Sequence, residues 1–216
     1  MASSQNIADI RNNYSQQALN EDSVAENPVQ QFKVWLDEAI TSEAPEPTAL
    51  VLSTVSAAGK PSARVVLLKG VDDAGFTFFT NYNSRKGQEL EAFPYAAITF
   101  FWPSLERQVR VEGKVVKVAP EVSDEYFHSR PQGSQIGAWA SPQSQVIQTR
   151  EELEELDEKY KQQFSEVDVI PRPSHWGGFQ LQPEAVEFWQ GRPNRLHDRI
   201  LYEQEDGKWQ LKRLAP

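Results

Sequence analysis

From Ala49 onward the chain is a succession of short apolar segments separated by turn residues, and this pattern restricts its possible folds more than any other feature. Strand-like runs occur at 49–56, 61–69, 76–80, 96–102, 107–118, 177–183, 185–190, 197–204 and 208–214. Residues 57–60 (AAGK) separate the first two runs and predict a hairpin. Because strands and helices do not alternate, a doubly wound parallel sheet is disfavoured. The pattern predicts a mainly β (α+β) fold, an antiparallel barrel with peripheral helices.

Helical signals are few and local. Asn27 is a candidate N-cap before Pro28, and apolar residues follow at helical spacing: Val29, Phe32, Leu36 and Ile40. We expect further helices at 84–93, across 123–139, and from Thr149 to about Phe164, where Thr149 and Glu152 form a capping-box pattern. Residues 1–27 are polar without periodicity, which predicts a mobile N-terminal arm and leaves 28–216 as a single domain.

Composition narrows the class of protein. The 216 residues suffice for one sizeable core, and the net charge of −9 disfavours nucleic acid as a partner. The sequence has no apolar run of membrane-spanning length and no signal-peptide pattern at its start, so we expect no membrane partner and a cytoplasmic location. The absence of cysteine excludes disulfides, thiolate metal sites and cysteine nucleophiles.

Several common site motifs are missing from the sequence. It contains neither GxGxxG nor GxxxxGK[ST], so side chains would have to hold any phosphorylated cofactor. His128, His175 and His197 are far apart and lack paired helical spacing, so we expect no metal site. A serine triad is also disfavoured because no G-x-S-x-G elbow occurs. The positions of the basic residues are therefore the most informative feature left.

Two groups of basic residues are candidates for phosphate contacts. Arg64 and Lys69 flank the apolar run RVVLLK, and their odd separation places them on opposite faces of a regular strand. They would then serve different ligands or remain solvated, unless a bulge brings them together. Ser84, Arg85 and Lys86 open a predicted helix, where free N–H groups and two cations suit a phosphate.

Two further groups of candidate residues lie in the middle of the chain. Gln108 and Arg110 share a strand face, and the Gln108 amide either recognises a heterocycle edge or pairs across strands. Tyr126, Arg130 and Ser134 offer a phenol, a guanidinium and a hydroxyl, which suits a phosphate ester. The alternative is an ordinary surface loop.

Near the C-terminus, Trp189 precedes a cluster of cations. Arg195, His197 and Arg199 share one face if their segment is extended. Three cation-capable groups on one face are costly without an anionic partner, so this cluster favours an anion site.

Together, these segments resemble the pyridoxamine 5'-phosphate oxidase family from about Ala49 to Pro216. The motifs in order are RVVLLK, FFTNYNSRKG, LERQVRVEGKV, YFHSRP-x-x-SQIGAW, PQSQVI, P-x-P-x-x-WGGF, EFWQG, RLHDR and the terminal RLAP. RLHDR combined with SRP-x-x-SQIGAW is a specific pairing. The resemblance implies a split β-barrel homodimer with FMN in clefts at the subunit interface, to which both chains contribute.

The resemblance also implies a set of site residues. Positions that match the family's FMN-binding motifs are Arg64, Val65, Val66, Leu67, Leu68, Lys69, Phe79, Thr80, Arg85, Lys86, Gln108, Gln143, Ser144, Trp189 and Arg199. Those that match its substrate-binding positions are Lys69, Tyr126, Arg130 and Ser134 for the phosphate, and Arg195, Leu196 and His197 over the reacting ring. Arg195 and His197 are the expected catalytic pair. Arg11 and Tyr14 fit an Arg-x-x-Tyr pattern that can fold over the substrate, although the acidic stretch after them departs from the family.

The implied activity is oxidation of pyridoxamine or pyridoxine 5'-phosphate to pyridoxal 5'-phosphate, a step of vitamin B6 metabolism. Dioxygen is the expected acceptor and hydrogen peroxide the expected product. Flavin reductases and deazaflavin- or haem-using relatives would lack RLHDR and the SRP-x-x-S motif. A non-catalytic protein that binds flavin or pyridoxal phosphate, and a purely structural β-barrel, remain as alternatives.

Overall fold

The computed structural model describes residues 6–7 and 13–216, which divide into two compact units. The first unit takes its described residues from the segment up to 47, from 99–111 and from 185–216. The second comprises 48–98 and 112–184. Strands β5 (Tyr95–Trp102), β6 (Arg107–Lys117) and β7 (Trp176–Gln190) contribute residues to both. The expectation of one domain over 28–216 stays a prediction.

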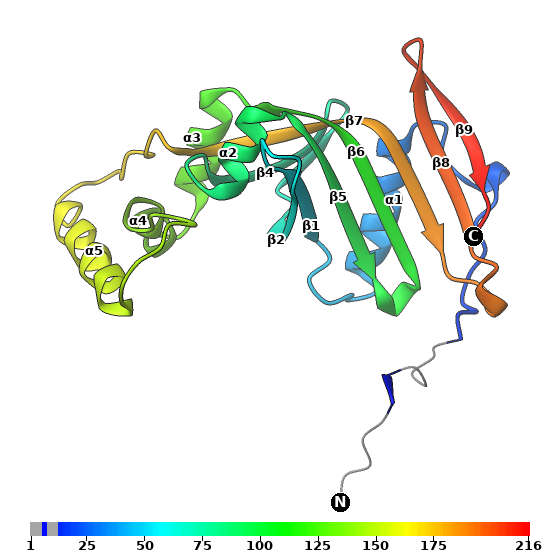
Figure 1. The fold of residues 1–216 in the computed structure, drawn as a ribbon, viewed down its shortest axis with the longest axis horizontal. Coiled ribbons are helices and arrows are strands. Elements are labelled where there is room, and N and C mark those ends of the chain that lie inside the picture. The colour runs from blue at the N-terminus through cyan, green and yellow to red at the C-terminus, as the bar shows by residue number, and fades with distance from the viewer. Residues whose placement is uncertain (1–5, 8–12) are drawn as a thin grey trace, which may run out of the picture. The chain divides into compact units, whose positions relative to one another are not determined.

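The strands of the described chain form one sheet (Figure 1). Its hydrogen-bonded order is β2-β1-β5-β6-β7-β4-β3, and β8 pairs with both β7 and β9. The β1–β2, β3–β4, β4–β7, β7–β8 and β8–β9 pairs are antiparallel. Helices are peripheral to this sheet, which confirms the predicted mainly β fold with peripheral helices. Within the described ranges, no helix has both the length and the apolar character needed to cross a membrane.

In the second unit, the predicted hairpin is present. Strand β1 (Ala49–Val55) pairs with β2 (Pro61–Leu67), with Ala49 opposite Leu67 and Val55 opposite Pro61. Strand β3 (Gly70–Asp72) then pairs with β4 (Gly75–Asn81). Helix α2 (Arg85–Ala92) follows, because the Ser84 side chain caps it by accepting a hydrogen bond from Gly87 N.

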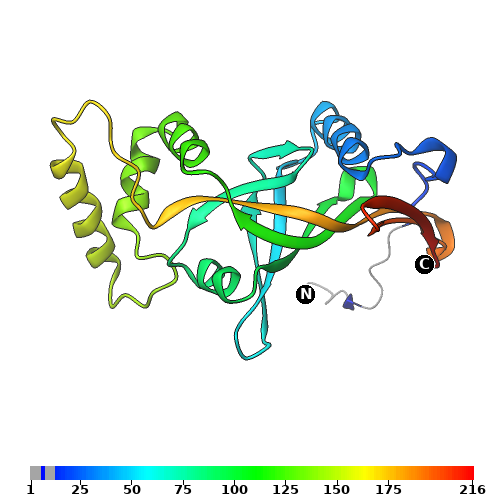
Figure 2. The same ribbon diagram turned by 90° about the horizontal axis from the view of Figure 1, so that it is seen from above.

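The helical region predicted across 123–139 is two helices, not one. Helix α3 (Pro120–Ser129) ends before Arg130, and α4 (Gln132–Ala140) begins after Pro131. The break follows from the proline, which disfavours helical geometry in the residue before it. Helix α5 (Arg150–Gln163) lies beside α4 in both views (Figures 1 and 2). The Thr149 hydroxyl caps it as expected, whereas Glu152 accepts from Gln148 N instead of closing the box on Thr149.

One apolar cluster of the second unit is formed by side chains from α3 and α4, from the end of α5 and the loop after it, and from β7. Its buried residues are Phe127, Ile136, Ala138, Phe164, Ile170 and Trp176. Phe79 and Tyr126 pack against this cluster from its edge. The cluster thereby supports one wall of the cavity described below.

In the first unit, helix α1 (Pro28–Thr41) begins where the sequence predicts. The Asn27 side chain accepts hydrogen bonds from Val29 N and Gln30 N. Its buried stripe consists of Val29, Phe32, Trp35 and Ala39, whereas Ile40 is exposed. The prediction of Ile40 as a buried residue was therefore wrong. Trp35 packs on Phe188, so the buried face of the helix includes Trp35 and Ala39 and leaves Ile40 exposed. Phe32 completes the core against Phe100 and Trp102.

The C-terminal strands belong to the first unit from residue 185 onward. The two runs predicted at 177–183 and 185–190 form one continuous strand, β7, which passes through Pro183. Strands β8 (Asp198–Glu205) and β9 (Lys208–Leu214) form a hairpin (Figure 1). The remaining elements are short 3₁₀ turns: η2 (Glu21–Ser23), η3 (Pro103–Leu105) and η4 (Pro193–Arg195).

The described part of the N-terminal segment is held to the first unit by polar contacts. Glu106 accepts hydrogen bonds from the backbone N–H groups of Ser15 and Gln16. Leu19 N donates to Asp198, and Arg213 forms a two-point ion pair with Glu21. We call residues 13–25 the strap. The mobility expected for residues 1–27 stays a prediction.

Candidate functional site

The second unit contains a cavity of about 360 Å³ that gathers most of the phosphate-binding candidates of that unit. Its lining residues are Arg64, Val65, Val66, Leu67, Lys69, Phe79, Thr80, Lys86, Tyr126, Arg130, Gln143 and Trp176. Four of these side chains are cationic, although the chain as a whole carries a charge of −9. The cavity is therefore suited to an anionic ligand.

One wall of the cavity consists of parallel aromatic rings. The rings of Phe79 and Tyr126 stack with centroids 4.1 Å apart, and Trp176 stacks on Phe79 at 5.6 Å. The Arg130 guanidinium lies 4.6 Å from the Trp176 ring centroid. Stacked rings and a cation over an aromatic face form a rigid, partly apolar surface against which a planar ligand can pack.

Arg130 is held beside this wall with an unsatisfied donor. Its Nη1 is buried and has no hydrogen-bond partner, the one such side-chain atom among the buried groups of the described residues. Burial lowers the pKa of Arg130, while the nearby Tyr126 opposes the shift. A buried guanidinium N–H without a partner is costly, and an anion in the cavity would satisfy it.

Lys86 is the most deeply buried cation of the cavity. Its Nζ donates to Gln143 Oε1 at 2.8 Å, Thr80 Oγ1 at 3.1 Å and Ser84 Oγ at 3.3 Å. All three acceptors are neutral. Burial, followed by the positive charge of Arg64, lowers the pKa of Lys86 to about 8. Burial therefore makes the ammonium less stable here than on an exposed lysine, and an anion in the cavity would offset that cost.

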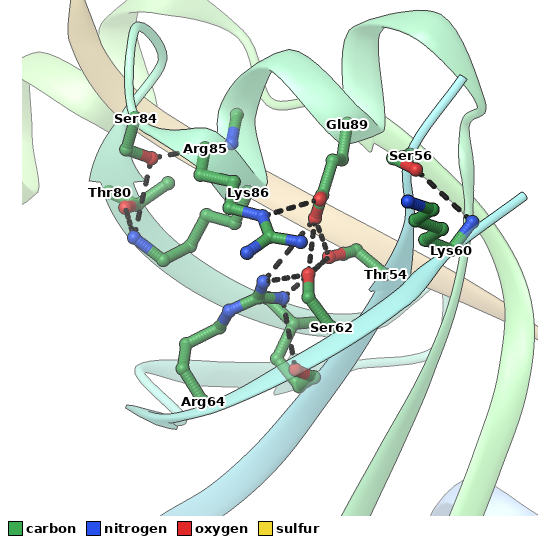
Figure 3. A network of polar contacts seen from close by, with 12 residues as sticks. Thr54, Ser56, Lys60, Ser62, Arg64, Thr80, Ser84, Arg85, Lys86 and Glu89 are labelled. Carbon is green, nitrogen blue, oxygen red and sulfur yellow. Dashed lines mark hydrogen bonds and ion pairs between the residues drawn. The ribbon is translucent and has the colours of Figure 1, made fainter. Parts of the chain in front are cut away.

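Arg64 lines the same cavity but is fixed from behind by the protein (Figure 3). Its Nη1 donates to Leu52 O and to Thr54 Oγ1, and its Nη2 donates to Ser62 Oγ and to Glu89 Oε2. The same Glu89 carboxylate also pairs with Arg85.

Arg64 lies on β2, but Lys69 lies beyond the end of that strand, so the two side chains do not follow one strand alternation. Pairing with β1 stops at Leu67, and Lys69 N donates to Thr77 O instead. Both side chains line the same cavity, so the break in the strand brings them together. The opposite faces expected for a regular strand therefore do not apply, and the open alternative, in which an irregularity brings the two residues together, holds.

Four residues predicted from the second unit lie outside the cavity lining. Leu68 is buried, Arg85 is paired with Glu89, and Ser134 and Ser144 are exposed. Ser144 also has a positive φ of 69°, which is uncommon for a residue other than glycine. The roles of these four residues stay predictions.

The first unit brings together a second group of candidates. The ring of Tyr14 meets Trp189 and His197 edge-on, with centroids 5.7 and 5.9 Å apart. Trp189 and His197 lie 4.6 Å apart. His197 Nδ1 accepts a hydrogen bond from Arg192 N, so the neutral ring carries its proton on Nε2. Burial and the charge of Arg195 lower the pKa of His197, which favours this neutral form.

The segment from Arg195 to Arg199 is not extended throughout, contrary to our assumption. Asn194 and Arg195 have φ of 58° and 62° within η4, and β8 starts only at Asp198. Arg195 and Leu196 are exposed. Arg195, His197 and Arg199 therefore do not share a strand face, because the turn at η4 changes the direction of the chain before β8 begins.

Arg199 already has the anionic partner that the sequence argument required. Glu187 accepts from its Nε and Nη2, and Arg110 pairs with the same carboxylate. The hydrogen bond that Arg199 donates to Glu187 is the main reason why the pKa of Arg199 is raised. Gln108 and Arg110 lie half-buried on the same face of β6, as predicted. Arg11 lies outside the described residues.

Sequence reasoning missed several residues that hold the site together. Glu89 is four residues after Arg85 on a helix, a spacing that could have revealed the pair. Glu187 and Trp176 gave no such signal, because their partners are distant in sequence. No group of three metal-ligating side chains is found within the described residues.

The chain matches two family models. One, described as "Pyridoxamine 5'-phosphate oxidase", covers residues 36–163. The other, described as "Pyridoxine 5'-phosphate oxidase C-terminal dimerisation region", covers residues 176–216. Together they span both units.

Curated relatives carry the same description over nearly the whole length. The pyridoxine/pyridoxamine 5'-phosphate oxidase of Salinibacter ruber is 54% identical over 212 residues, covering 97% of this chain and 99% of the relative. That of Cupriavidus pinatubonensis is 57% identical over 211 residues, covering 97% and 99%.

Solved structures share the fold. PhzG from Burkholderia lata, crystallised with tetrahydrophenazine-1-carboxylic acid, has a TM-score of 0.87 and 30% identity, covering 94% of this chain and all of PhzG. A pyridoxamine 5'-phosphate oxidase-related, FMN-binding protein from Nostoc punctiforme has a TM-score of 0.70 at 19% identity, covering 90% of this chain and all of that protein. These neighbours confirm the split-barrel fold.

Proposed function

The chain belongs to the pyridoxamine 5'-phosphate oxidase family, and on that premise we propose that it oxidises pyridoxamine and pyridoxine 5'-phosphate to pyridoxal 5'-phosphate with FMN as cofactor. The observation that carries this proposal is the cavity of the second unit. It combines an aromatic wall with a buried Lys86 whose partners are neutral and a buried Arg130 N–H that has no partner. Such a site suits a planar ring that bears a phosphate.

The residues present fit FMN. A phosphate dianion would give Lys86 an anionic partner and would lie beside Arg64, whose guanidinium is already fixed. Gln143 and Thr80 hold Nζ of Lys86 and so set the direction of the ammonium. The other residues named on the family motifs, including Gln108, Trp189 and Arg199, are proposed to contact the same cofactor.

When bound, FMN would supply the acceptor for a hydride, that is two electrons and one proton, from C4' of the substrate, and dioxygen would be the final acceptor with hydrogen peroxide as product. The chain's own contribution is positioning. Lys69, Tyr126 and Arg130 are proposed to bind the substrate phosphate, together with Ser134. Contacts to a phosphate remote from C4' fix the reacting carbon without interfering with it.

Arg195 and His197 are proposed to act on the reacting end of the substrate. Arg195 is permanently charged, so it orients the substrate and stabilises negative charge. His197 holds its proton on Nε2, which makes it a hydrogen-bond donor to the amine or hydroxyl in this state. Tyr14 packs against His197 and is proposed to cover the substrate together with Arg11.

We propose a homodimer that binds FMN at the subunit interface, with both chains contributing to each site. The match of residues 176–216 to a dimerisation region supports this arrangement. The cytoplasm is the proposed location, and dioxygen the proposed second substrate.

The test is an anaerobic mixture of FMN-loaded protein with pyridoxamine 5'-phosphate. We expect the visible flavin absorbance to bleach, to return on admission of air, and to be accompanied by hydrogen peroxide. A yellow protein that never bleaches would be the non-catalytic flavin-binding alternative, and the proposal would then be wrong.

An Arg130→Ala variant makes the same test specific. It should retain FMN but need about 10- to 100-fold more substrate for half-maximal bleaching, because one charged phosphate contact contributes about 1.5–3 kcal/mol. Arg150→Ala, at an exposed position of α5, is the matched control and should behave like the unaltered protein. Loss of FMN with unchanged substrate affinity in Arg130→Ala would contradict the assignment.

A further inference from the structure

Glu89 is a buried carboxylate at the centre of the polar network behind the cavity (Figure 3). It lies on α2, and its side chain is 6% exposed. Its Oε2 accepts from Thr54 Oγ1 at 2.5 Å and from Ser62 Oγ at 2.6 Å. Its Oε1 accepts from Arg85 Nε at 2.9 Å.

The carboxylate is ionised throughout the neutral range. Burial alone would raise the pKa of Glu89, but hydrogen bonds from Ser62, Thr54 and Arg85 lower it to about 2. The network therefore contains a fixed negative charge in contact with Arg64, one of the cations that line the cavity.

The two hydroxyls connect Glu89 to Arg64. Thr54 and Ser62 donate to the carboxylate, and each accepts from one Nη atom of Arg64 at 2.5 Å. A hydroxyl has one proton, so donating it to Glu89 turns its lone pairs toward the guanidinium. Arg64 is thus oriented through two relays and one direct contact of 3.3 Å. Its Nε–H takes part in none of these bonds, and Arg64 lines the cavity.

The second arginine is fixed by the same carboxylate. Arg85 is 60% exposed, and its ion pair with Glu89 spans one helical turn. A long exposed side chain samples many rotamers, and this contact restricts it. One anion therefore sets the orientation of two guanidinium groups.

A contribution to folding stability alone is a weak explanation for Glu89. Burying a carboxylate costs several hydrogen bonds to water, and apolar replacements of buried ion pairs are often as stable. The arrangement is better explained by what it presents to the cavity.

We propose that Glu89 is a positioning residue that presets Arg64 and Arg85 for the phosphate ester of the flavin. This inference rests on the proposed function. Glu89 itself is behind the arginines and does not bind the ligand. Its effect should therefore be confined to ligands that carry the phosphate.

The experiment compares FMN with riboflavin, which is the same ring system without the phosphate. In Glu89→Gln the carboxylate is replaced by a neutral amide of nearly equal size. We expect the dissociation constant for FMN, measured by flavin fluorescence, to rise about 10-fold, while that for riboflavin changes less than about twofold. Glu91→Gln is the matched control: it lies on the same helix, is 68% exposed, and pairs with Lys117. It should leave both constants unchanged.

Ser62→Ala is a second variant, which tests the inference even if Glu89→Gln does not fold. It removes one relay to Arg64 and should weaken FMN about threefold without affecting riboflavin. Equal weakening of both ligands in either variant would show a purely structural role and overturn the inference, as would unchanged or tighter FMN binding. Failure of the unaltered protein to bind FMN would instead contradict the proposed function.

Discussion

At the scale of single residues, the cations that we propose to bind phosphate in the second unit have charges that are compensated to different degrees. Arg64 and Arg85 share the carboxylate of Glu89, Lys86 has only neutral partners, and Nη1 of Arg130 has none. The least compensated groups are the ones that gain most from an anionic ligand.

Because Lys86 is proposed to contact the FMN phosphate, we expect FMN affinity to depend on pH. Its pKa is lowered from 10.5 to about 8, so the ligand-free side chain is cationic below pH 8 and loses its charge above it. The phosphate remains a dianion over this range, because its second pKa is about 6. We expect the dissociation constant for FMN to rise about 10-fold between pH 7 and pH 9.

The measurement is a fluorescence titration at each pH, with riboflavin as the control ligand. Riboflavin has no phosphate, so its affinity should stay flat over the same range. An FMN affinity that is equally flat would mean that Lys86 does not contact the phosphate.

The basic residues could be found from the sequence, whereas their partners could not. Arg64, Lys86 and Arg130 were all predicted, and so was Tyr126, because motifs and residue chemistry are local properties. Thr54 and Ser62 contact Arg64 within the β1–β2 hairpin, but Glu89 reaches these hydroxyls only when α2 packs on the hairpin. Contacts of that kind depend on tertiary packing, which periodicity does not show.

At the scale of elements, the strap is the segment that positions Tyr14. Glu106 has a left-handed backbone with φ of 54°, and its carboxylate accepts two backbone N–H bonds from the strap. Arg107 donates to the side chains of Gln17, Glu38 and Gln190. The next residues of the strap, Ser15 to Gln17, thus make the contacts that hold Tyr14 against Trp189 and His197.

Gly191 leaves the space that Tyr14 occupies. A Cβ at this position would lie 2.7 Å from both Cβ and Cγ of Tyr14 and 3.0 Å from Cβ of Glu106. Gly191→Ala should therefore displace Tyr14 from His197 and lower kcat/KM about 10-fold, with FMN affinity unchanged.

Steady-state kinetics and FMN titration of the variant check this expectation. Gly137→Ala is the control, because a Cβ there meets nothing within 4 Å. A Gly191→Ala variant with full kcat/KM would show that the docked position of Tyr14 does not affect the reaction.

Elements with local signals at their ends were predicted well. Asn27, Ser84 and Thr149 each cap the helix that follows, and the AAGK turn joins β1 to β2. The turn at η4 was missed because Asn194 and Arg195 adopt positive φ without a glycine to signal it. The continuity of β7 through Pro183 was missed because proline normally interrupts a strand.

At the scale of the whole molecule, cofactor binding and fold stability are linked. A ligand that binds only the folded state stabilises it, by about 2.7 kcal/mol at a concentration 100 times its dissociation constant. For a chain of this length, that corresponds to a rise in Tm of about 5–10 °C.

Calorimetry of the ligand-free protein with and without FMN measures this shift. Riboflavin at the same concentration should give a clearly smaller shift, because the phosphate contacts are missing. Equal shifts for the two flavins would place the binding energy in the ring system alone.

The buried Nη1 of Arg130 has a consequence for handling the protein at the bench. Inorganic phosphate and sulfate are compact oxyanions with several acceptor atoms, and either can satisfy a buried guanidinium N–H. We therefore expect phosphate buffer and ammonium sulfate to compete with the substrate for Arg130. Zwitterionic buffers with chloride as the counter-ion leave Arg130 available to the substrate phosphate.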